Sequence, residues 1–436
     1  MLQPAAMSAA MVHVVGAGLA GLSAAVSLAG RGMAVTLWEA APQAGGRCRS
    51  YHDPQLGMVI DNGNHLVLSG NQAVARYLSA IGAEERLEGP DEAAFPFLDL
   101  RDGTRWVLRP NNGRLPWWVL QSGRRVPGTR PQDYLALARL LRRQPGRRID
   151  ALLPCRGALW ERLLRPVLLS ALNTAPEEGA ADLAGAVLRE SLGRGGRAAW
   201  PRIASPTLAA AFVDPAIAFL SRRGAAIRFG QRLRGLSLED GRVSGLAFGG
   251  PMVTLGPRDR VVLAVPPWTA AELLPGLSVP EDFRPILNAH FRATPPPGAP
   301  ALAGLVGGLV DWVFAFPDRL SVTISDARHL MEEPSDALAA RLWAEVARLH
   351  GLSAEAPQNG IPPWRIVKER RATFAATPEQ EARRPSPRTG WTNLVLAGDW
   401  VRTGLPATIE GALRSGEAAA ALSLSPSEAK SEMVAP

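Results

Sequence analysis

A chain of 436 residues is too long for one compact core, so we expect two or three domains. A hydrophobic content of 47% and a charged content of 20% exclude a disordered or fibrous protein. With two cysteines the chain cannot build a disulfide framework, and it lacks the Cys/His spacing of a metal site. We therefore predict a reducing compartment and no metal.

The net charge of +8 is concentrated in one segment. Between Arg101 and Arg165 the chain has fifteen arginines and four acidic residues, a local charge of +11, so the remainder is slightly acidic. A basic surface of this kind suits anionic lipid or nucleic acid. No recognisable nucleic-acid module accompanies it, so we predict lipid and no nucleic acid.

The first element is an apolar stretch over residues 11–30, MVHVVGAGLAGLSAAVSLAG, which is long enough to cross a bilayer. No basic residue precedes it, unlike a signal peptide, and Gly16, Gly18 and Gly21 interrupt it. Its pattern predicts a short buried strand, VHVV, followed by a helix of small residues that ends near Gly30. The stretch therefore indicates the start of a nucleotide-binding fold rather than a membrane anchor.

A second strand, AVTLWEA over residues 34–40, completes a strand–turn–helix–strand unit with the pattern G-x-G-x-x-G at its first turn. Gly16 permits the tight turn, Gly18 lets the backbone approach a pyrophosphate, and Gly21 lets the helix pack closely on the sheet. The helix N-terminus favours the phosphates. Glu39, 23 residues after Gly16, is suited to the ribose hydroxyls.

Three further motifs favour FAD over NAD. Gly45-Gly46 and Arg47 offer a close backbone approach and a phosphate partner, and residues 58–68, MVIDNGNHLVL, place Asp61, Gly63 and His65 on a strand and turn. Residues 393–422, NLVLAGDWVRTGLPATIEGALRSGEAAAAL, predict a strand, a turn with Asp399 and a second helix of small residues. The carboxylate suits a ribityl hydroxyl, and the helix start suits the electron-rich end of a flavin ring.

These motifs resemble the FAD-dependent amine oxidase and phytoene desaturase superfamily. Within it the chain resembles the hydroxysqualene dehydroxylases, also described as squalene-associated FAD-dependent desaturases. The stretches that carry the narrower resemblance are DNGNHLVLSGN, LLSALNTAPEEGAADLAGAVLRESL, LNAHFR, GGLVDWVFAFPDRLSVTISDA and LVLAGDWVRTGLPATIEGALRSG. The sequence departs from the expected pattern at Asn64, where glutamine is expected, and at Ile409, where methionine is expected.

The resemblance implies a set of residues in contact with a non-covalent FAD. They are Gly16, Ala17, Gly18, Ala20, Gly21, Glu39, Ala40, Gly46, Arg47, Gly63, Asn64, His65, Leu233, Gly398, Asp399, Ala407, Thr408 and Ile409. Cys48 is expected to be structural, because the covalent cysteine of the superfamily lies in the C-terminal motif, where this chain has none. His65 is either a proton donor at the flavin or a packed histidine, and we expect Glu410 to have a structural role.

The predicted fold is α/β, with a Rossmann-like FAD-binding domain, a parallel sheet with flanking helices, and an α+β substrate domain that has a mixed sheet and a helical subdomain. The FAD domain is expected to be discontinuous, over residues 11–70, 205–265 and 390–421. Residues 71–204 and 266–389 form the substrate domain, and residues 422–436 are expected to be a disordered tail. A strand hairpin is expected to turn at residues 239–241, and a helix to start at Asp336 with Leu338, Leu342, Val346 and Leu349 on its apolar face.

Residues 115–148 combine a tryptophan pair, many arginines and the amphipathic run DYLALARLLRR. They predict a patch that lies on an anionic membrane, with a substrate-domain helix and its solvated arginine face as the alternative. The protein is therefore expected to be cytoplasmic and peripheral on the inner face of the cytoplasmic membrane.

The resemblance implies an oxidoreductase that removes the allylic hydroxyl group of hydroxysqualene to give squalene for hopanoid synthesis. Its substrate would be an isoprenoid lipid, and a prenyl synthase is a candidate docking partner. A carotenoid or phytoene-type desaturase, an amine oxidase and a non-catalytic lipid-binding flavoprotein are the alternatives.

Overall fold

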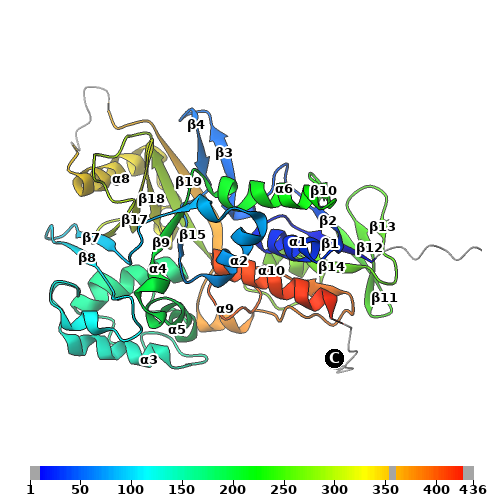
Figure 1. The fold of residues 1–436 in the computed structure, drawn as a ribbon, viewed down its shortest axis with the longest axis horizontal. Helices are drawn as coiled ribbons and strands as arrows, with labels where there is room; N and C mark the ends of the chain where they lie inside the picture. Colours follow the sequence, from blue (N-terminus) through cyan, green and yellow to red (C-terminus); the bar gives the residue numbers. More distant parts are fainter. Residues whose placement is uncertain (1–9, 353–359, 426–436) are drawn as a thin grey trace, which may run out of the picture.

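A parallel sheet of five strands and a mixed sheet of seven strands organise the computed structural model, which describes residues 10–352 and 360–425 (Figure 1). The α/β fold class predicted from the sequence is confirmed by this arrangement and by the solved structures reported below.

The five-stranded sheet takes its strands from segments that lie far apart in the chain. In spatial order they are β10 (Ala226–Arg228), β2 (Ala34–Trp38), β1 (Met11–Val15), β14 (Arg260–Leu263) and β20 (Leu394–Leu396), and all pair in parallel. The sheet therefore joins the N-terminal motif, a middle segment and the C-terminal motif. The exact domain limits stay a prediction.

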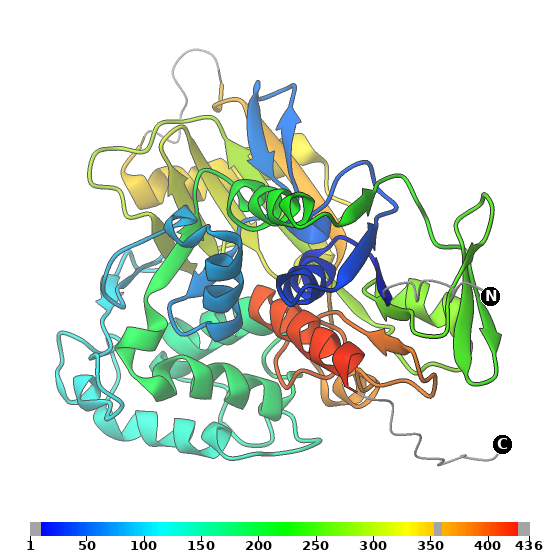
Figure 2. The same cartoon turned by 45° about the vertical axis from the view of Figure 1, so that its right-hand side comes forward.

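Two different layers cover the two faces of this sheet. One face packs on the helices α1 (Leu19–Gly30), α2 (Gln72–Ile81), α6 (Asp214–Arg222) and α10 (Ile409–Leu424). The other packs on a meander of three strands, β11 (Gly235–Glu239), β12 (Arg242–Ala247) and β13 (Val253–Thr254), and on helix α7 (Pro267–Leu273). Helices α1 and α10 lie side by side, although they are the first and the last α-helix of the described residues (Figure 2). They approach closely because Gly416 has no side chain, and a Cβ there would overlap the carbonyl oxygen of Ala20.

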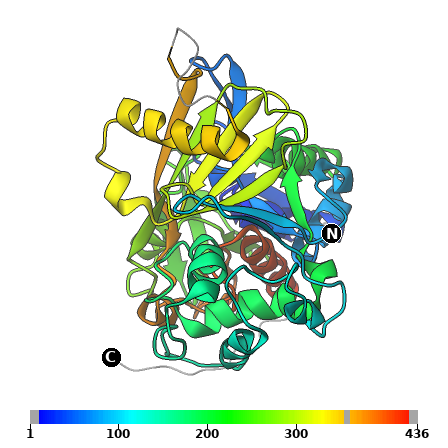
Figure 3. The ribbon, with the colours of Figure 1, turned by 90° about the vertical axis from the view of Figure 1, so that its left-hand side faces the viewer.

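The seven-stranded sheet forms the core of the other half of the molecule. Its strands, in spatial order, are β19 (Trp364–Phe374), β15 (Phe283–Phe291), β18 (Arg319–Ile324), β17 (Trp312–Phe316), β16 (Leu302–Val306), β7 (Phe95–Asp99) and β8 (Arg105–Leu108). Helix α8 (Ser335–His350) covers one face of the sheet (Figure 3). The opposite face packs toward the short helices α3 (Leu137–Leu141), α4 (Arg165–Leu172) and α5 (Ala181–Glu190).

Two small sheets connect these halves. One pairs β3 (Ser50–Asp53) with β4 (Met58–Asp61), and the other places β9 (Pro201–Ala204) between β5 (Leu66–Leu68) and β6 (Leu87–Glu88). The loop between β4 and β5 carries the motif DNGNH and runs along the seven-stranded sheet. The short helix α9 (Pro378–Ala382) precedes the C-terminal motif.

Several local predictions are confirmed. The hairpin between β11 and β12 turns at Asp240-Gly241, where both residues have positive φ angles, as a two-residue turn between twisted strands requires. Helix α8 buries all four leucine and valine positions of its predicted apolar face.

Three segments differ from what their sequence pattern suggests. Residues 301–316 are a single apolar run in the sequence but form two strands, β16 and β17, because Gly307 with φ +81° turns the chain within it. The run at 133–143 is a 3-10 turn over Pro131–Ala136 followed by α3, and the chain is extended again at Arg142. The expected tail begins too early, because α10 continues to Leu424. Residues 426–436 of that tail lie outside the described residues.

Candidate functional site

The glycine motif lies at the carboxyl end of β1, where α1 begins. A Cβ at Gly16 would overlap the carbonyl oxygen of Ala264, and one at Gly21 would overlap the carbonyl oxygen of Gly16, so both positions require glycine. Gly18 differs, since no atom lies within 4 Å of its Cβ position. Gly46 packs directly against Gly18, with 3.3 Å between its Cβ position and the Cα of Gly18. The open side of Gly18 is the space that a pyrophosphate would fill.

Glu39 is fixed beside this loop by two backbone hydrogen bonds. Its carboxylate accepts one from the N–H of Ala17 at 2.7 Å and one from the N–H of Ala41 at 2.8 Å. The Glu39 backbone also bonds Arg228 and Gln231, which brings buried Leu233 to the same edge of the sheet. Glu39 and Leu233, which are predicted to contact the ribose and the adenine, therefore lie at the same edge of the sheet, with exposed Ala40 beside Glu39.

Arg47 and Asp399 join the two ends of the chain. The guanidinium donates two hydrogen bonds to the carboxylate, at 2.7 and 2.6 Å, and a third to the carbonyl oxygen of Ala372. The Arg47 side chain keeps 44% of its surface exposed, whereas that of Asp399 keeps 7%. Both bonds to the carboxylate come from Nη2, so Asp399 orients the arginine through one nitrogen while Nη1 is held by Ala372.

Arg384 holds the loop that carries Asp399, and sequence reasoning missed it. Its side chain is fully buried and donates to the carbonyl oxygens of Asp399, Val401 and Leu405. Its charge is balanced by Glu381 at 2.6 Å. No motif marks Arg384 in the sequence, because its partners are backbone carbonyls.

The start of α10 follows the same loop. Thr408 caps the helix by accepting the N–H of Gly411 at 3.0 Å, and Ile409 is the first helical residue. Ala407 and Thr408 are partly exposed, whereas Gly398 is buried at the end of β20. Glu410 points elsewhere: it accepts the N–H groups of Ala73 and Val74, both at 3.0 Å, and so caps α2. Its structural role is confirmed by these bonds.

His65 lies 4.0 Å from the thiol of Cys48, measured from its Nε2 to Sγ. Burial, together with the charge of Arg47, lowers the pKa of His65 to about 4, so the ring is neutral at pH 7. Burial raises the pKa of the Cys48 thiol to about 12, which leaves it protonated and a poor nucleophile. The raised pKa of Cys48 supports a structural role for this residue. The lowered pKa of His65 indicates that its ring does not carry a proton donor's positive charge at pH 7.

A buried histidine that sequence reasoning did not single out lies behind the same loop. The Nε2–H of His290 donates to the carbonyl oxygen of Asp61 at 3.1 Å, so its Nδ1 accepts from the hydroxyl of Ser321 at 2.8 Å. Burial is the main cause that lowers the pKa of His290 to about 3, and Arg319 adds to it. The neutral ring thus fixes the loop to the seven-stranded sheet.

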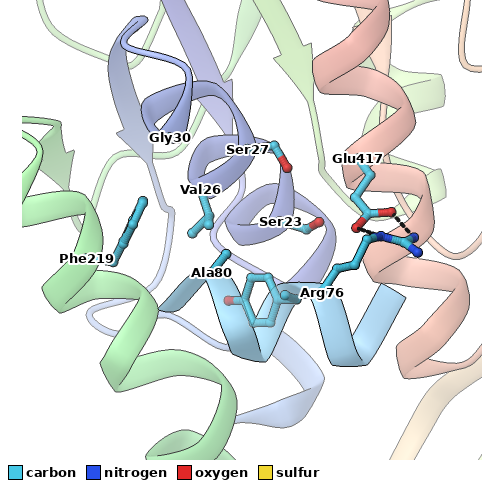
Figure 4. Close-up of a pocket in the computed structure, with 9 residues that line it drawn as sticks. Ser23, Val26, Ser27, Gly30, Arg76, Ala80, Phe219 and Glu417 are labelled. Carbon is cyan, nitrogen blue, oxygen red and sulfur yellow. Dashed lines mark hydrogen bonds and ion pairs between the residues drawn. The ribbon is translucent and has the colours of Figure 1, made fainter. Parts of the chain in front are cut away.

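A separate cavity of about 260 Å³ opens between α1, α2, α6 and α10 (Figure 4). Its lining includes Ser23, Tyr77 and Phe219, and the ion pair of Arg76 and Glu417, 2.6 Å long, lies at one side. None of the predicted FAD contacts lines it. The cavity is therefore distinct from the edge where the motifs meet.

The comparisons with known proteins agree with this geometry. Residues 19–423 match the family model of flavin-containing amine oxidoreductases. The chain belongs to this family. It is a FAD-dependent oxidoreductase, as the resemblance of its motifs predicted.

Two relatives are similar to this chain over nearly its whole length. The chain is 54% identical to the hydroxysqualene dehydroxylase of Rhodopseudomonas palustris and 52% identical to that of Sinorhizobium fredii, over 95% of this chain and 98% of each relative. An L-amino-acid oxidase of Bungarus fasciatus is 44% identical, but over 16% of this chain and 14% of its own.

Solved structures share the fold. A putative protoporphyrinogen oxidase from Exiguobacterium superposes with a TM-score of 0.67 at 19% identity, over 95% of this chain and 98% of its own. An oxidoreductase from Methanosarcina mazei gives a TM-score of 0.70 at 15% identity, over 94% and 99%.

The residues at this edge fit FAD. The open face of Gly18, the partly exposed side chain of Arg47 and the carboxylate of Glu39 have the chemistry that pyrophosphate and ribose require. That each predicted residue touches the cofactor stays a prediction.

Substituting Gly18 tests the phosphate loop. Its φ of −71° suits any residue and its Cβ position is free, so Gly18→Val should fold but place a side chain in the pyrophosphate space. We expect purified protein with little or no flavin absorbance near the visible maximum and an unchanged circular dichroism spectrum. Gly250→Val, at another open glycine, is the control that should stay yellow. A yellow Gly18→Val protein would refute the assignment.

The buried histidine predicts a pH dependence of stability. The folded pKa of His290 lies below the ordinary value of 6.5, so the unfolded chain binds the proton more readily. Its contribution to stability is complete above about pH 6.5 and is lost as the pH falls toward 3. We compare how much the free energy of unfolding decreases when the pH is lowered from 7 to 5. This decrease should be about 2 kcal/mol smaller in His290→Gln than in the parent protein.

Denaturant titrations at both pH values measure this difference. His52→Gln, at an exposed position on β3, is the control and should follow the parent protein. Parallel pH curves for His290→Gln and the parent would contradict the prediction.

Proposed function

We propose that the protein reductively removes the allylic hydroxyl group of hydroxysqualene and releases squalene. The observation that carries the proposal is identity above 50% to hydroxysqualene dehydroxylases, spread over 95% of the chain. The matches to amino-acid oxidases cover only about a fifth of this chain. They therefore indicate that one segment is similar, and they do not indicate a common substrate.

The sheet face opposite α8 is largely aromatic. Its side chains are buried in one apolar cluster: Phe97, Trp106, Trp312, Phe314 and Phe316. An apolar interior of this kind excludes water, which suits chemistry at an allylic carbon.

The tyrosines of the chain speak against an aromatic cage for an amine. The hydroxyl of Tyr77 donates to the carbonyl oxygen of Phe212, Tyr134 packs edge-on against Trp118, and Tyr51 lies on β3. Trp400 is buried and its indole N–H donates to the carbonyl oxygen of Val265. These contacts commit Tyr77, Tyr134 and Trp400 to packing.

The overall change replaces the C–O bond with a C–H bond, consumes a hydride and a proton, and releases water. When bound, reduced FAD supplies the hydride. The chain would hold the dinucleotide through Gly18, Glu39 and Arg47. A neutral His65 can hydrogen-bond a departing water molecule, but its pKa of about 4 excludes it as a stored proton at pH 7.

An anaerobic reaction tests the proposal. Holoenzyme reduced with dithionite and mixed with hydroxysqualene should regain the oxidised flavin spectrum and form squalene in equal amount. Reduction of the oxidised enzyme by phytoene or an amine would instead support an oxidising member of the family. Binding without any flavin change would support a lipid carrier, and either result would overturn the proposal.

We infer further that the protein binds the surface of an anionic membrane, where its lipid substrate resides. Large apolar side chains are exposed on the two turns before α3 and on α3 itself, and we call them the apolar patch: Leu115 80%, Trp117 47%, Leu120 68%, Leu135 74% and Leu141 41%. The two turns pack together through Trp118 and Tyr134. In Figure 2 the segment that carries these residues (cyan) lies at the outer edge of the helical layer, away from the five-stranded sheet.

The positive charge near the apolar patch also favours an anionic membrane. Arg142 and Arg143 are exposed directly after α3, and Arg124 lies over the ring of Trp117 at 5.1 Å. Apolar side chains ringed by arginines suit the headgroup region of an anionic bilayer. No helix in residues 10–352 and 360–425 is long and apolar enough to cross a bilayer. A position on the cytoplasmic face and docking with a prenyl synthase stay predictions.

Binding of protein variants to lipid vesicles tests this inference. Each arginine near an anionic surface contributes about 1 kcal/mol, so Arg142→Gln with Arg143→Gln should weaken binding to phosphatidylglycerol vesicles roughly 30-fold. Arg31→Gln with Arg222→Gln removes the same charge from exposed positions elsewhere and should bind like the parent. Leu120→Gln with Leu135→Gln should also weaken binding, whereas Met252→Gln should not. Equal sedimentation of all variants with vesicles would refute the membrane surface.

A further inference from the structure

Three charged side chains are bonded together at the start of α10, and we call them the charge network: Glu190, Glu410 and Arg414. The guanidinium of Arg414 donates to both carboxylate oxygens of Glu190, at 3.0 and 2.7 Å, and to the carboxylate of Glu410 at 3.0 Å. Glu410 is the second residue of α10, and Arg414 reaches back to it across one helical turn. Glu190 is the last residue of α5, so the network joins the helical layer to α10.

The carboxylate of Glu410 is fixed by donors on two helices. Its two oxygens accept the N–H groups of Ala73 and Val74 at the start of α2, and one of them also accepts from Arg414. Three donors to one carboxylate stabilise its charged form. Two carboxylates against one guanidinium leave the charge network with one negative charge, so Arg414 offsets half of the acidic charge at this helix start.

The network is largely shielded from water. The side chain of Glu410 keeps 4% of its surface exposed, that of Glu190 23% and that of Arg414 32%. The hydrogen bonds from Arg414 lower the pKa of Glu190, and those to Glu190 are the main cause that raises the pKa of Arg414, so both residues stay charged at pH 7. Charges in such partly buried surroundings interact more strongly with their neighbours than charges in water.

A flavin ring at the start of α10 would respond to this charge. Thr408 and Ile409, which are predicted to contact the flavin, directly precede Glu410 in the chain. Reduction makes the electron-rich end of the ring more negative, so a positive charge nearby favours the reduced cofactor and a negative charge disfavours it. Arg414 is therefore placed to balance two carboxylates that would otherwise oppose reduction.

We propose that Arg414 sets the reduction potential of the bound FAD by balancing the charges of Glu190 and Glu410 at the start of α10. Arg414 is a positioning residue, because it acts through the orientation and the charge of Glu410. The inference goes beyond the proposed function, since it rests on the predicted flavin contacts of α10 and not on the identity of the substrate. It also gives the helical layer a part in the redox chemistry, because Glu190 belongs to α5.

The reduction potential of the holoenzyme tests the inference. It is measured by anaerobic equilibration with a reference dye, after the flavin content of each variant has been determined. Arg414→Gln leaves two carboxylates unbalanced and should shift the potential to a lower value. Glu190→Gln keeps Arg414 but removes one negative charge, so it should shift the potential to a higher value. Arg414→Lys keeps the positive charge and should remain closer to the parent protein than Arg414→Gln.

Glu417→Gln is the matched control. It removes the same charge from the same helix, about two turns or roughly 10 Å further along the axis. There the side chain of Glu417 pairs with Arg76 at 2.6 Å and keeps 27% of its surface exposed. The potential of this variant should therefore lie closer to that of the parent protein than the potential of Glu190→Gln.

The signs of the shifts separate charge from loss of structure. A general loosening of the site would move Arg414→Gln and Glu190→Gln in the same direction, and that result would overturn the inference. So would shifts no larger than that of Glu417→Gln. If Arg414→Gln purifies without flavin, Glu190→Gln decides alone, because only a higher potential agrees with the inference. No substrate takes part in the measurement, so a failure of the hydroxysqualene reaction and a failure of this inference are seen separately.

Discussion

The ion pair of Arg47 and Asp399 is the interaction on which the site depends. It connects residues 352 positions apart and brings the loop after β2 against the loop after β20. The five-stranded parallel sheet makes this possible, because the carboxyl ends of β1, β2 and β20 meet at one edge. Arg384 holds the second loop from behind, so the position of Asp399 depends on buried hydrogen bonds to carbonyl groups.

Close packing of small residues supports the same edge. Gly16, Gly21 and Gly416 each sit where a Cβ would overlap a carbonyl oxygen, and they allow β14, α1 and α10 to approach. Gly18 has free space instead, although it belongs to the same motif. Structure therefore separates glycines that serve packing from the glycine that leaves room for a ligand, a distinction that spacing alone does not make.

Local patterns predicted much of the fold. Helix α8 follows from apolar periodicity, since its apolar residues share one buried face, whereas β1 and α1 follow from continuous apolar runs that are buried nearly throughout. The turn at Gly307 was missed because the apolar run continues through it, and α3 is shorter than its amphipathic pattern. For the site, motifs indicated Gly18, Glu39, Arg47 and Asp399.

The roles of Arg384, and of Asn288 and Thr323, which bond Asn64 in the loop with the motif DNGNH, could not be predicted from the sequence. Each acts through partners that are distant in the chain and are mostly backbone atoms or residues on neighbouring strands. Their environment depends on strand register, and shifting a strand by one residue would move every side chain to the other face. Local sequence does not specify that register.

The aromatic packing on the seven-stranded sheet has a physical cause. Gly304 on β16 lies between Trp312 on β17 and Phe97 on β7, and a Cβ there would overlap the ring of Phe97. The missing side chain lets Phe97 pack edge-on against Trp312 at 5.4 Å and stack on Trp106 at 5.2 Å, so the aromatic packing continues across β16. On the other side of Trp312 the loop with the motif DNGNH contacts the sheet, and its amide groups require polar partners there. One glycine and one loop therefore set where the sheet changes from an aromatic core to the polar contacts that hold the loop.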